Sequence, residues 1–356
     1  MTSSIARGPV GGPSILWALP SWIYGAAVAV RNRRFDAGRG VARLPCPVVS
    51  IGNLTLGGTG KTPMVAEVAR MLDAAERRPI VALRGYKSRD GRSDEAELHR
   101  QALPAIPVIV GADRRRAILE SGVDLAPPSV VILDDGFQHR RLARDLDVVL
   151  VDATRPGLDD RLVPAGWLRE PVGGLRRADV VIVTRAPGVD PRLASRIERA
   201  HGRPPVAWTS HAWSLLEIHR GTAGPELASM DWLRGRRVAT LSGTGHPDSF
   251  RAMVREHGAE ELANLPAADH QHYDLAAAAR LERAVETAGA SCLVTTAKDW
   301  VKLGRVWSGR LPAVVPSLSL RWIEGREAFL ERLLQSIRRD QSNEVVPRTG
   351  RPAQTS

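Results

Sequence analysis

A glycine-rich segment near the start of the chain has the residue types and spacing that bind phosphate. Residues 47–53, PVVSIGN, are typical of a buried strand, and LTLGGTGKTP follows them. In such a strand–loop–helix turn, backbone N–H groups and the helix dipole point at phosphate oxygens, a lysine reaches the terminal phosphates and a hydroxyl binds Mg²⁺. The sequence therefore predicts a nucleoside triphosphate site made by Gly57, Gly58, Thr59, Gly60, Lys61 and Thr62.

Other nucleotide-binding classes fit this loop less well. The usual pattern begins with glycine five residues before Gly60, where this chain has Thr55. Partitioning ATPases place a signature lysine just before the paired glycines, and here that position is Leu56. A GTPase would need an Asn-Lys-x-Asp segment to read guanine, and the sequence has none. These differences disfavour both a partitioning ATPase and a GTPase.

Acidic residues follow the hydrophobic run VVIL. Asp134 and Asp135 stand at its carboxyl end, directly before GFQH. In a phosphate-loop domain, acidic residues at this edge of the sheet are placed to hold Mg²⁺, directly or through water. A carboxylate that caps the following turn is the structural alternative. Asp152, at the end of the next strand, and the Arg169–Glu170 pair are weaker candidates for the same cluster.

Two further segments carry residues suited to phosphoryl transfer. Transfer to a hydroxyl needs a base for the proton and cations that hold the acceptor. RGYK contains Arg84 and Lys87, and Asp94 follows in the next loop. ADHQHY contains His270. We interpret Asp94 and His270 as base candidates, and Arg84 and Lys87 as a grip for an anion.

The elements that must position these residues alternate along the chain. Runs of β-branched residues separated by helical patterns indicate buried parallel strands joined by right-handed crossovers. The fold class predicted is α/β: a phosphate-loop NTPase-type, three-layer domain with a mostly parallel sheet over residues 40–190. A second, smaller α/β domain is expected over residues 191–340, closing over the site. The Pro-, Arg- and Gly-rich segment over residues 186–203 is expected to bridge the two domains. A disordered tail is expected over 341–356.

An apolar segment precedes these domains. Residues 14–30, SILWALPSWIYGAAVAV, carry no charge, and three arginines follow within four residues. This pattern predicts a membrane-associated N-terminal region over residues 1–39, anchored or lying in the interface, that holds the body on the cytoplasmic side of the membrane. A helix packed on the protein's own core is the alternative. A signal peptide is disfavoured because the charges follow the apolar run.

Composition limits the partners. The net charge of +11 with 43% hydrophobic residues fits a globular protein that meets an anionic partner. No DNA- or RNA-binding motif is visible and aromatic residues make up 4%, so we expect no nucleic acid partner. The two cysteines make no local metal or redox motif. Almost every basic residue is arginine, which makes the four lysines candidates for sites that need a compact ammonium: Lys61, Lys87, Lys298 and Lys302.

The ordered motifs resemble one family, the tetraacyldisaccharide 4'-kinases, which are the lipid A kinases of Gram-negative bacteria. The resemblance covers nearly the whole chain, and its motifs run in family order: SWIYG, PVVSIGNLTLGGTGKTP, RGYK, SDEA, DDGFQHRRLARDLDVVLVDA, LVPAGWLREP, GTGHPDSF, ADHQHY and TTAKDWVKL. It implies a kinase at the inner leaflet that transfers the γ-phosphoryl of ATP to the 4'-hydroxyl of a tetraacylated disaccharide 1-phosphate. No obligate protein partner is expected.

The resemblance also implies roles for matching residues. Asp94 and His270 would form the acid–base dyad, and Lys61 would act on ATP. Thr62, Asp134 and Asp135 would serve Mg²⁺, and Gln138 would lie near the nucleotide. Four residues would surround the substrate: Arg84, Glu95, Arg169 and Glu170.

Other classes remain as alternatives. A switch or partitioning-type ATPase would hydrolyse ATP without phosphorylating a substrate. A soluble small-molecule kinase would work without the N-terminal apolar segment.

Overall fold

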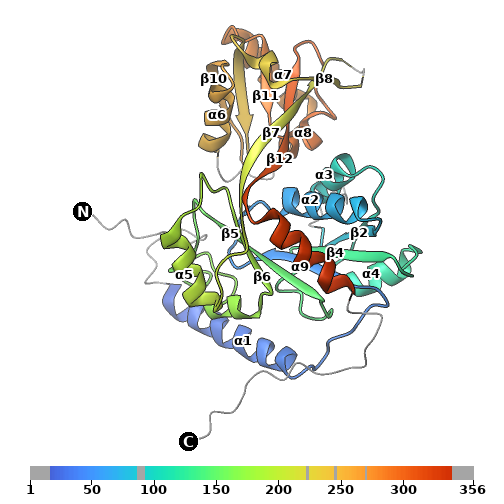
Figure 1. Ribbon diagram of the computed structural model, residues 1–356. Coiled ribbons are helices and arrows are strands. Elements are labelled where there is room, and N and C mark those ends of the chain that lie inside the picture. The colour runs from blue at the N-terminus through green and yellow to red at the C-terminus, as the bar shows by residue number, and fades with distance from the viewer. Residues whose placement is uncertain (1–16, 86–92, 222–223, 244–246, 269–270, 339–356) are drawn as a thin grey trace, which may run out of the picture.

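The computed structural model describes residues 17–85, 93–221, 224–243, 247–268 and 271–338. Across these ranges the strands form one twelve-stranded sheet in the order β10-β9-β11-β12-β7-β6-β5-β1-β4-β2-β3, with β8 added beside β7 (Figure 1). The sheet has two parts, which we call the phosphate-loop half and the second half. The two long strands β7 (Ala207–His219) and β12 (Ala313–Glu324) run antiparallel to each other and join them.

The phosphate-loop half contains parallel strands with helices on both faces. Its strands are β1 (Val48–Asn53), β2 (Arg78–Leu83), β3 (Val108–Val110), β4 (Ser129–Asp134), β5 (Leu146–Asp152) and β6 (Val180–Thr184). Its helices are α2 (Lys61–Ala74), α3 (Asp94–Ala102), α4 (Arg114–Glu120), the 3-10 helix η2 (Val172–Arg177), α5 (Pro191–His201) and α9 (Arg326–Arg338). β1 pairs with β4 and β5, so it lies inside the sheet.

Alternating residues divide this half into three layers. Along β5, Val148 and Leu150 pack in the same core as α2 and α9, while Val149 and Val151 pack with η2 and α5. Successive side chains of a strand point to opposite faces, so an uninterrupted apolar strand must be covered on both. The predicted phosphate-loop NTPase-type α/β fold is confirmed.

The second half repeats the layered arrangement on a smaller scale. Its strands are β8 (Glu226–Ala228), β9 (Arg237–Ser242), β10 (Glu260–Pro266) and β11 (Cys292–Thr295), with the outer ends of β7 and β12. Its helices are the 3-10 helix η3 (Met230–Leu233), α6 (Pro247–Glu256), α7 (Leu275–Thr287) and α8 (Ala297–Leu303). α6 packs on one face and α7 on the other.

The division between the halves differs from the one that we expected at residues 190 and 191. α5 occupies most of the segment predicted as a bridge, and Leu193 and Ile197 pack in the phosphate-loop core. α9 returns from the second half, and Phe329 and Leu333 pack beside α2. Two elements assigned to the second domain therefore stabilise the first. The expected tail over 341–356 lies outside the described residues.

The N-terminal helix α1 runs over Ala18–Asp36 and includes the arginines that follow the apolar stretch. It lies at the bottom of Figure 1, at the other end of the molecule from β10 and β11. Only two of its residues, Ser21 and Val28, are buried. Among the helices of the described ranges, none has the length and apolar character needed to cross a membrane.

Candidate functional site

The phosphate loop joins β1 to α2 in the conformation that its glycines permit. Gly60 has a φ of +82°, and a β-carbon there would lie 2.8 Å from Nε2 of His211 on β7. Both the backbone geometry and the close approach require glycine. The loop is attached to β6, because the Thr184 hydroxyl donates to the Thr59 carbonyl oxygen over 2.8 Å. α2 then begins at Lys61, so its N-terminus points into the loop.

Lys61 lies among oxygen atoms of the loop and of the neighbouring strand. Its Nζ donates to Asn53 Oδ1 at 3.1 Å and lies 3.5 Å from Asp135 Oδ1. Asn53 is the last residue of β1, and it is fully buried. Lys61 and Asp135 were both predicted for this site, whereas Asn53 was not. A buried asparagine that ends a hydrophobic strand was the available signal.

Asp134 ends β4 directly beside β1, with which it pairs at Ile51. It is buried, and its Oδ2 accepts a hydrogen bond from His99 Nε2 at 2.8 Å. Its other oxygen, Oδ1, is buried with no hydrogen-bond partner in the described part of the chain. His99 comes from α3 and is itself fully buried. Sequence reasoning missed it because no motif contained it.

Asp135 sits at the turn after β4 with a φ of +53°, a backbone conformation that costs energy in a non-glycine residue. Its two oxygens accept from Nη1 of Arg169 at 2.8 and 2.6 Å. Burial would raise the pKa of Asp135, but the positive charges of Lys61 and Arg169 outweigh it and hold the pKa below its usual range. Asp135 is therefore an ionised carboxylate between two cations.

Gln138 and Glu170 are hydrogen-bonded to each other beside this cluster. Gln138 Nε2 donates to the Asn53 carbonyl and to Glu170 Oε1, each over 2.8 Å. Glu170 is fully buried, and its Oε2 accepts from Arg177 at 2.7 Å. This position favours a role for Glu170 in holding Gln138 over the direct substrate contact that we expected.

Asp94 and Glu95 begin α3 on the side of the acidic cluster. Ser93 caps the helix by accepting from Ala96 N, and Asp94 pairs with Lys302 of α8 at 3.1 Å. Burial and the nearby charge of Asp134 raise the pKa of Glu95. Glu95 therefore lies in the field of the predicted metal-binding carboxylates.

The remaining predicted residues are Arg84, Lys87, His270 and Thr62. Arg84 is exposed just after β2. Lys87 and His270 lie outside the described residues, so the expected Asp94–His270 dyad is not described by the structure. Thr62 is half-buried in the first turn of α2, beside Lys61.

A further cation, missed from the sequence, flanks the loop. Arg185 follows β6 with a φ of +52°, and its Nη2 would lie 3.9 Å from a β-carbon at Gly58. It forms an ion pair with Asp152, whose Oδ1 accepts from the backbone and hydroxyl of Thr154. Asp152, a weak candidate in the sequence, thus holds a second arginine beside the phosphate loop.

The site meets the requirements of Mg²⁺. In kinases this ion is held by one or two carboxylates together with substrate phosphates, and it prefers oxygen ligands. The unpartnered Oδ1 of Asp134, the ionised carboxylate of Asp135 and the hydroxyl of Thr62 provide such oxygens near the loop. In the described part of the chain, no group of three or more His, Cys, Asp and Glu could hold a metal unaided.

Comparisons with known proteins agree on one family. The family model for tetraacyldisaccharide-1-P 4'-kinase matches residues 13–338. The tetraacyldisaccharide 4'-kinase of Geobacter metallireducens is 39% identical over 86% of this chain and 95% of its own. That of Syntrophus aciditrophicus is 38% identical over 91% and 93%. The crystal structure of LpxK from Aquifex aeolicus, in complex with ATP, covers 91% of this chain and 99% of its own, with a TM-score of 0.70 and 27% identity.

Proposed function

The chain belongs to the tetraacyldisaccharide 1-phosphate 4'-kinase family, and from this membership we propose how its site carries out the family's reaction. The protein is an ATP-dependent phosphotransferase that phosphorylates the 4'-hydroxyl of tetraacyldisaccharide 1-phosphate, giving lipid IVA in lipid A biosynthesis. One observation carries the assignment of the site. Lys61 of the phosphate loop and Arg169 meet on the same carboxylate, Asp135, at the carboxyl edge of the sheet.

The phosphate loop binds ATP. Backbone N–H groups between Gly57 and Gly60 and the N-terminus of α2 hold the phosphates, and Lys61 moves from Asp135 to the terminal phosphate oxygens. When bound, Mg²⁺ would supply positive charge that offsets the negative charge developing on the phosphates during transfer. Thr62, Asp134 and Asp135 would hold it. Gln138 fixes the Asn53 carbonyl at the base of the loop.

We assign the residues that act on the acceptor hydroxyl of the lipid to the start of α3 and to His270. Asp94, together with His270, removes the proton of the 4'-hydroxyl as the phosphoryl group arrives in line. The position of Asp94 at the start of α3 supports this role. The neighbouring residue Glu95 lies close enough to Asp134 for that charge to raise its pKa, so the start of α3 faces the predicted metal-binding carboxylates. Arg84 and Arg169 supply positive charge for the anionic acceptor.

The membrane surface is assigned to α1. Leu19, Trp22 and Val30 are 68%, 72% and 66% exposed, which is unusual for large apolar side chains on one helix. Such a helix is suited to lie in a lipid interface, and a net charge of +11 favours an anionic leaflet. We therefore place the protein on the cytoplasmic face of the inner membrane, where its lipid substrate is anchored.

The dyad assignment is tested by steady-state kinetics with γ-labelled ATP and the acceptor in detergent micelles. Asp94→Asn and His270→Ala are each expected to lower turnover by at least about a hundredfold while Mg·ATP affinity stays near that of the wild type. Equal losses in turnover and nucleotide affinity would contradict the base assignment. A switch ATPase, the alternative function, would hydrolyse ATP while the lipid stays unlabelled.

A further inference from the structure

The N-terminal helix presents an unusual pair of faces. Leu19, Trp22 and Val30 point to solvent. The side facing the protein carries the buried Val28 together with Ser21, Tyr24 and Asn32, and each of these three polar residues makes a hydrogen bond to the body. A helix that served as an anchor alone would be expected to pack on the body through an apolar stripe. α1 is instead attached largely by directional polar contacts, and those of Tyr24 and Asn32 reach Arg169 and Glu170 of the candidate site.

Tyr24 contacts the backbone of Arg169, whose guanidinium binds Asp135. Its hydroxyl donates to the Arg169 carbonyl oxygen over 2.7 Å. The Arg169 N–H donates to the Leu54 carbonyl at 2.8 Å, just before the phosphate loop. Arg169 is therefore held on one side by α1 and on the other by the segment that leads into the loop, while its guanidinium binds Asp135.

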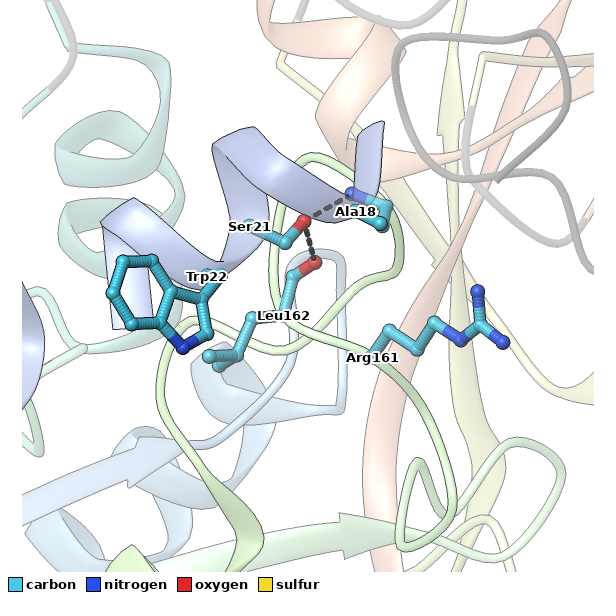
Figure 2. A pocket seen from close by; sticks show the side chains of 6 residues that line it. Ala18, Ser21, Trp22, Arg161 and Leu162 are labelled. Atoms are coloured by element: carbon cyan, nitrogen blue, oxygen red, sulfur yellow. Dashed lines mark hydrogen bonds between the residues drawn. The ribbon is translucent and has the colours of Figure 1, made fainter. Parts of the chain in front are cut away.

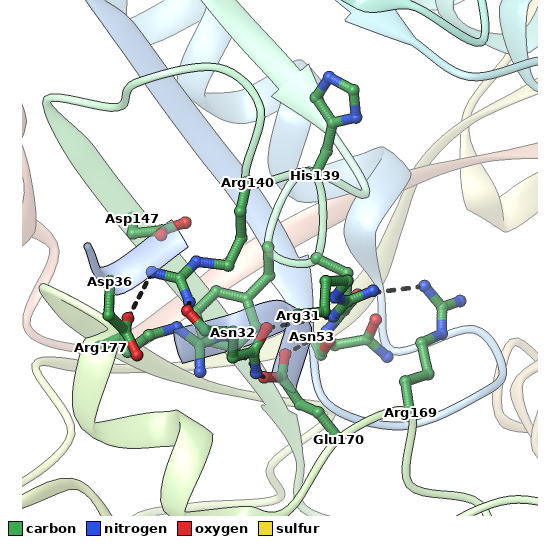
Figure 3. Close-up of polar contacts among 12 residues, drawn as sticks. Arg31, Asn32, Asp36, Asn53, His139, Arg140, Asp147, Arg169, Glu170 and Arg177 are labelled. Carbon is green, nitrogen blue, oxygen red and sulfur yellow. Dashed lines mark hydrogen bonds and ion pairs between the residues drawn. The ribbon is translucent and has the colours of Figure 1, made fainter. Parts of the chain in front are cut away.

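Asn32 contacts the next residue of the same segment. Its Nδ2 donates to Glu170 Oε2 at 3.3 Å, and the other carboxylate oxygen of Glu170 accepts from Gln138. Arg140 Nη1 in turn donates to the Asn32 carbonyl at 3.1 Å (Figure 3). Because Glu170 is fully buried, a lost donor there is not replaced by water.

Ser21 fixes the loop that precedes Arg169. Its hydroxyl donates to the Leu162 carbonyl at 3.0 Å (Figure 2). It also accepts from Ala165 N at 2.9 Å. A few residues on, the Trp167 carbonyl accepts from Leu56 N of the phosphate loop at 2.7 Å. The segment between α1 and the phosphate loop is thus hydrogen-bonded at both ends.

We propose that α1 is a structural part of the catalytic site, in which Tyr24 and Asn32 are positioning residues that act through Arg169 and Glu170. The helix proposed to face the lipid then also positions Arg169 against Asp135. Because Asp135 also contacts Lys61, α1 influences the position of Lys61. The expected effect on phosphoryl transfer to the lipid rests on the proposed function. The expected effect on the position of Arg169 can also be measured through the affinity for Mg·ATP.

The test compares the two faces of α1 in the full-length protein. Tyr24→Phe removes only the inward hydroxyl, and Leu19→Ser removes an outward apolar group that is 68% exposed. Three quantities are measured: turnover in detergent micelles, affinity for a fluorescent Mg·ATP analogue without lipid, and sedimentation with anionic vesicles. We expect Tyr24→Phe to lower turnover about tenfold with unchanged vesicle binding, and Leu19→Ser to weaken vesicle binding with unchanged nucleotide affinity.

A double-mutant cycle separates positioning from general stability. If Tyr24 acts through Arg169, Tyr24→Phe will have no further effect on turnover in an Arg169→Ala background. Equal effects of Tyr24→Phe in both backgrounds would overturn the proposal, as would a loss of turnover that merely follows vesicle binding. Failure of the wild type to phosphorylate the lipid would refute the proposed function instead. The cycle would then be read on affinity for the Mg·ATP analogue, where the same non-additivity supports positioning and additivity refutes it.

Discussion

Asp94 and Lys302 form an ion pair, with 3.1 Å between Oδ2 and Nζ, that joins α3 of the phosphate-loop half to α8 of the second half. Both side chains are largely buried, at 11% and 12% exposed. The carboxylate proposed as a base is therefore held by a lysine from the other half of the molecule. A partly buried pair of this kind is costly to break from one side.

Replacing Lys302 should therefore act on catalysis through Asp94. Lys302→Ala is expected to lower turnover roughly tenfold with little change in Mg·ATP affinity, because the base loses the group that fixes its position. Arg280→Ala, at an exposed cation on α7, is the matched control and should behave as the wild type. A Lys302→Ala enzyme with wild-type turnover would show that the pair only braces the two halves.

The buried His99–Asp134 contact predicts a stability effect. His99→Ala leaves the Asp134 carboxylate buried without its donor, which should lower the free energy of unfolding by about 3 kcal/mol. His99→Gln keeps a donor and should lose clearly less. Urea unfolding of both variants measures the difference, and equal losses would mean that the packing of the ring, not its hydrogen bond, matters.

Glu95 predicts a stabilising substitution. Because burial and Asp134 raise the pKa of Glu95 in the folded protein, its charge opposes folding once the pH exceeds the ordinary value of 4.5. Glu95→Gln should therefore raise the thermal midpoint at neutral pH, and this gain should vanish below pH 4.5. Glu97→Gln, on the same helix, is the control. A gain that persists unchanged in acid would contradict the electrostatic cause.

His139 predicts a loss of stability in acid. Burial, together with the charge of Arg114, lowers the pKa of His139 from 6.5 to about 4. The unfolded chain then takes up a proton more readily, so stability should fall as the pH drops from 6.5 to about 4. After allowance for solvent screening the loss is about 2 kcal/mol. His139→Gln should flatten this part of the unfolding profile, and a profile as steep as that of the wild type would exclude His139 as the source.

Much of the phosphate-loop half could be predicted from the sequence, since its buried parallel strands are continuous runs of β-branched residues and its loop has a recognisable glycine-rich motif. The full length of β7 and β12 and their antiparallel pairing could not, because polar residues such as Ser210 and Ser317 interrupt both strands. α5 was mistaken for a bridge because its segment is rich in arginine, whose apolar stems cover the surface while Leu193 and Ile197 face the core.

The site was predictable where one motif supplies adjacent residues, as for Lys61, Asp134 and Asp135. His99, Arg185 and Tyr24 act through residues distant in sequence, so their importance becomes visible only when the fold brings them together. Glu170 was expected near the cluster, but its complete burial could not be read from the motif LREP.

The kinase function is tested by the transfer of γ-labelled phosphate from ATP to the disaccharide 1-phosphate acceptor, with wild type and Lys61→Ala measured side by side. We expect labelled lipid with the wild type, and none above background with Lys61→Ala, which lacks the ammonium that binds the terminal phosphates. Arg116→Ala, at an exposed arginine on α4, should transfer like the wild type. Transfer by Lys61→Ala at the wild-type rate would contradict the role of Lys61. ATP hydrolysis by the wild type without labelled lipid would contradict the kinase function.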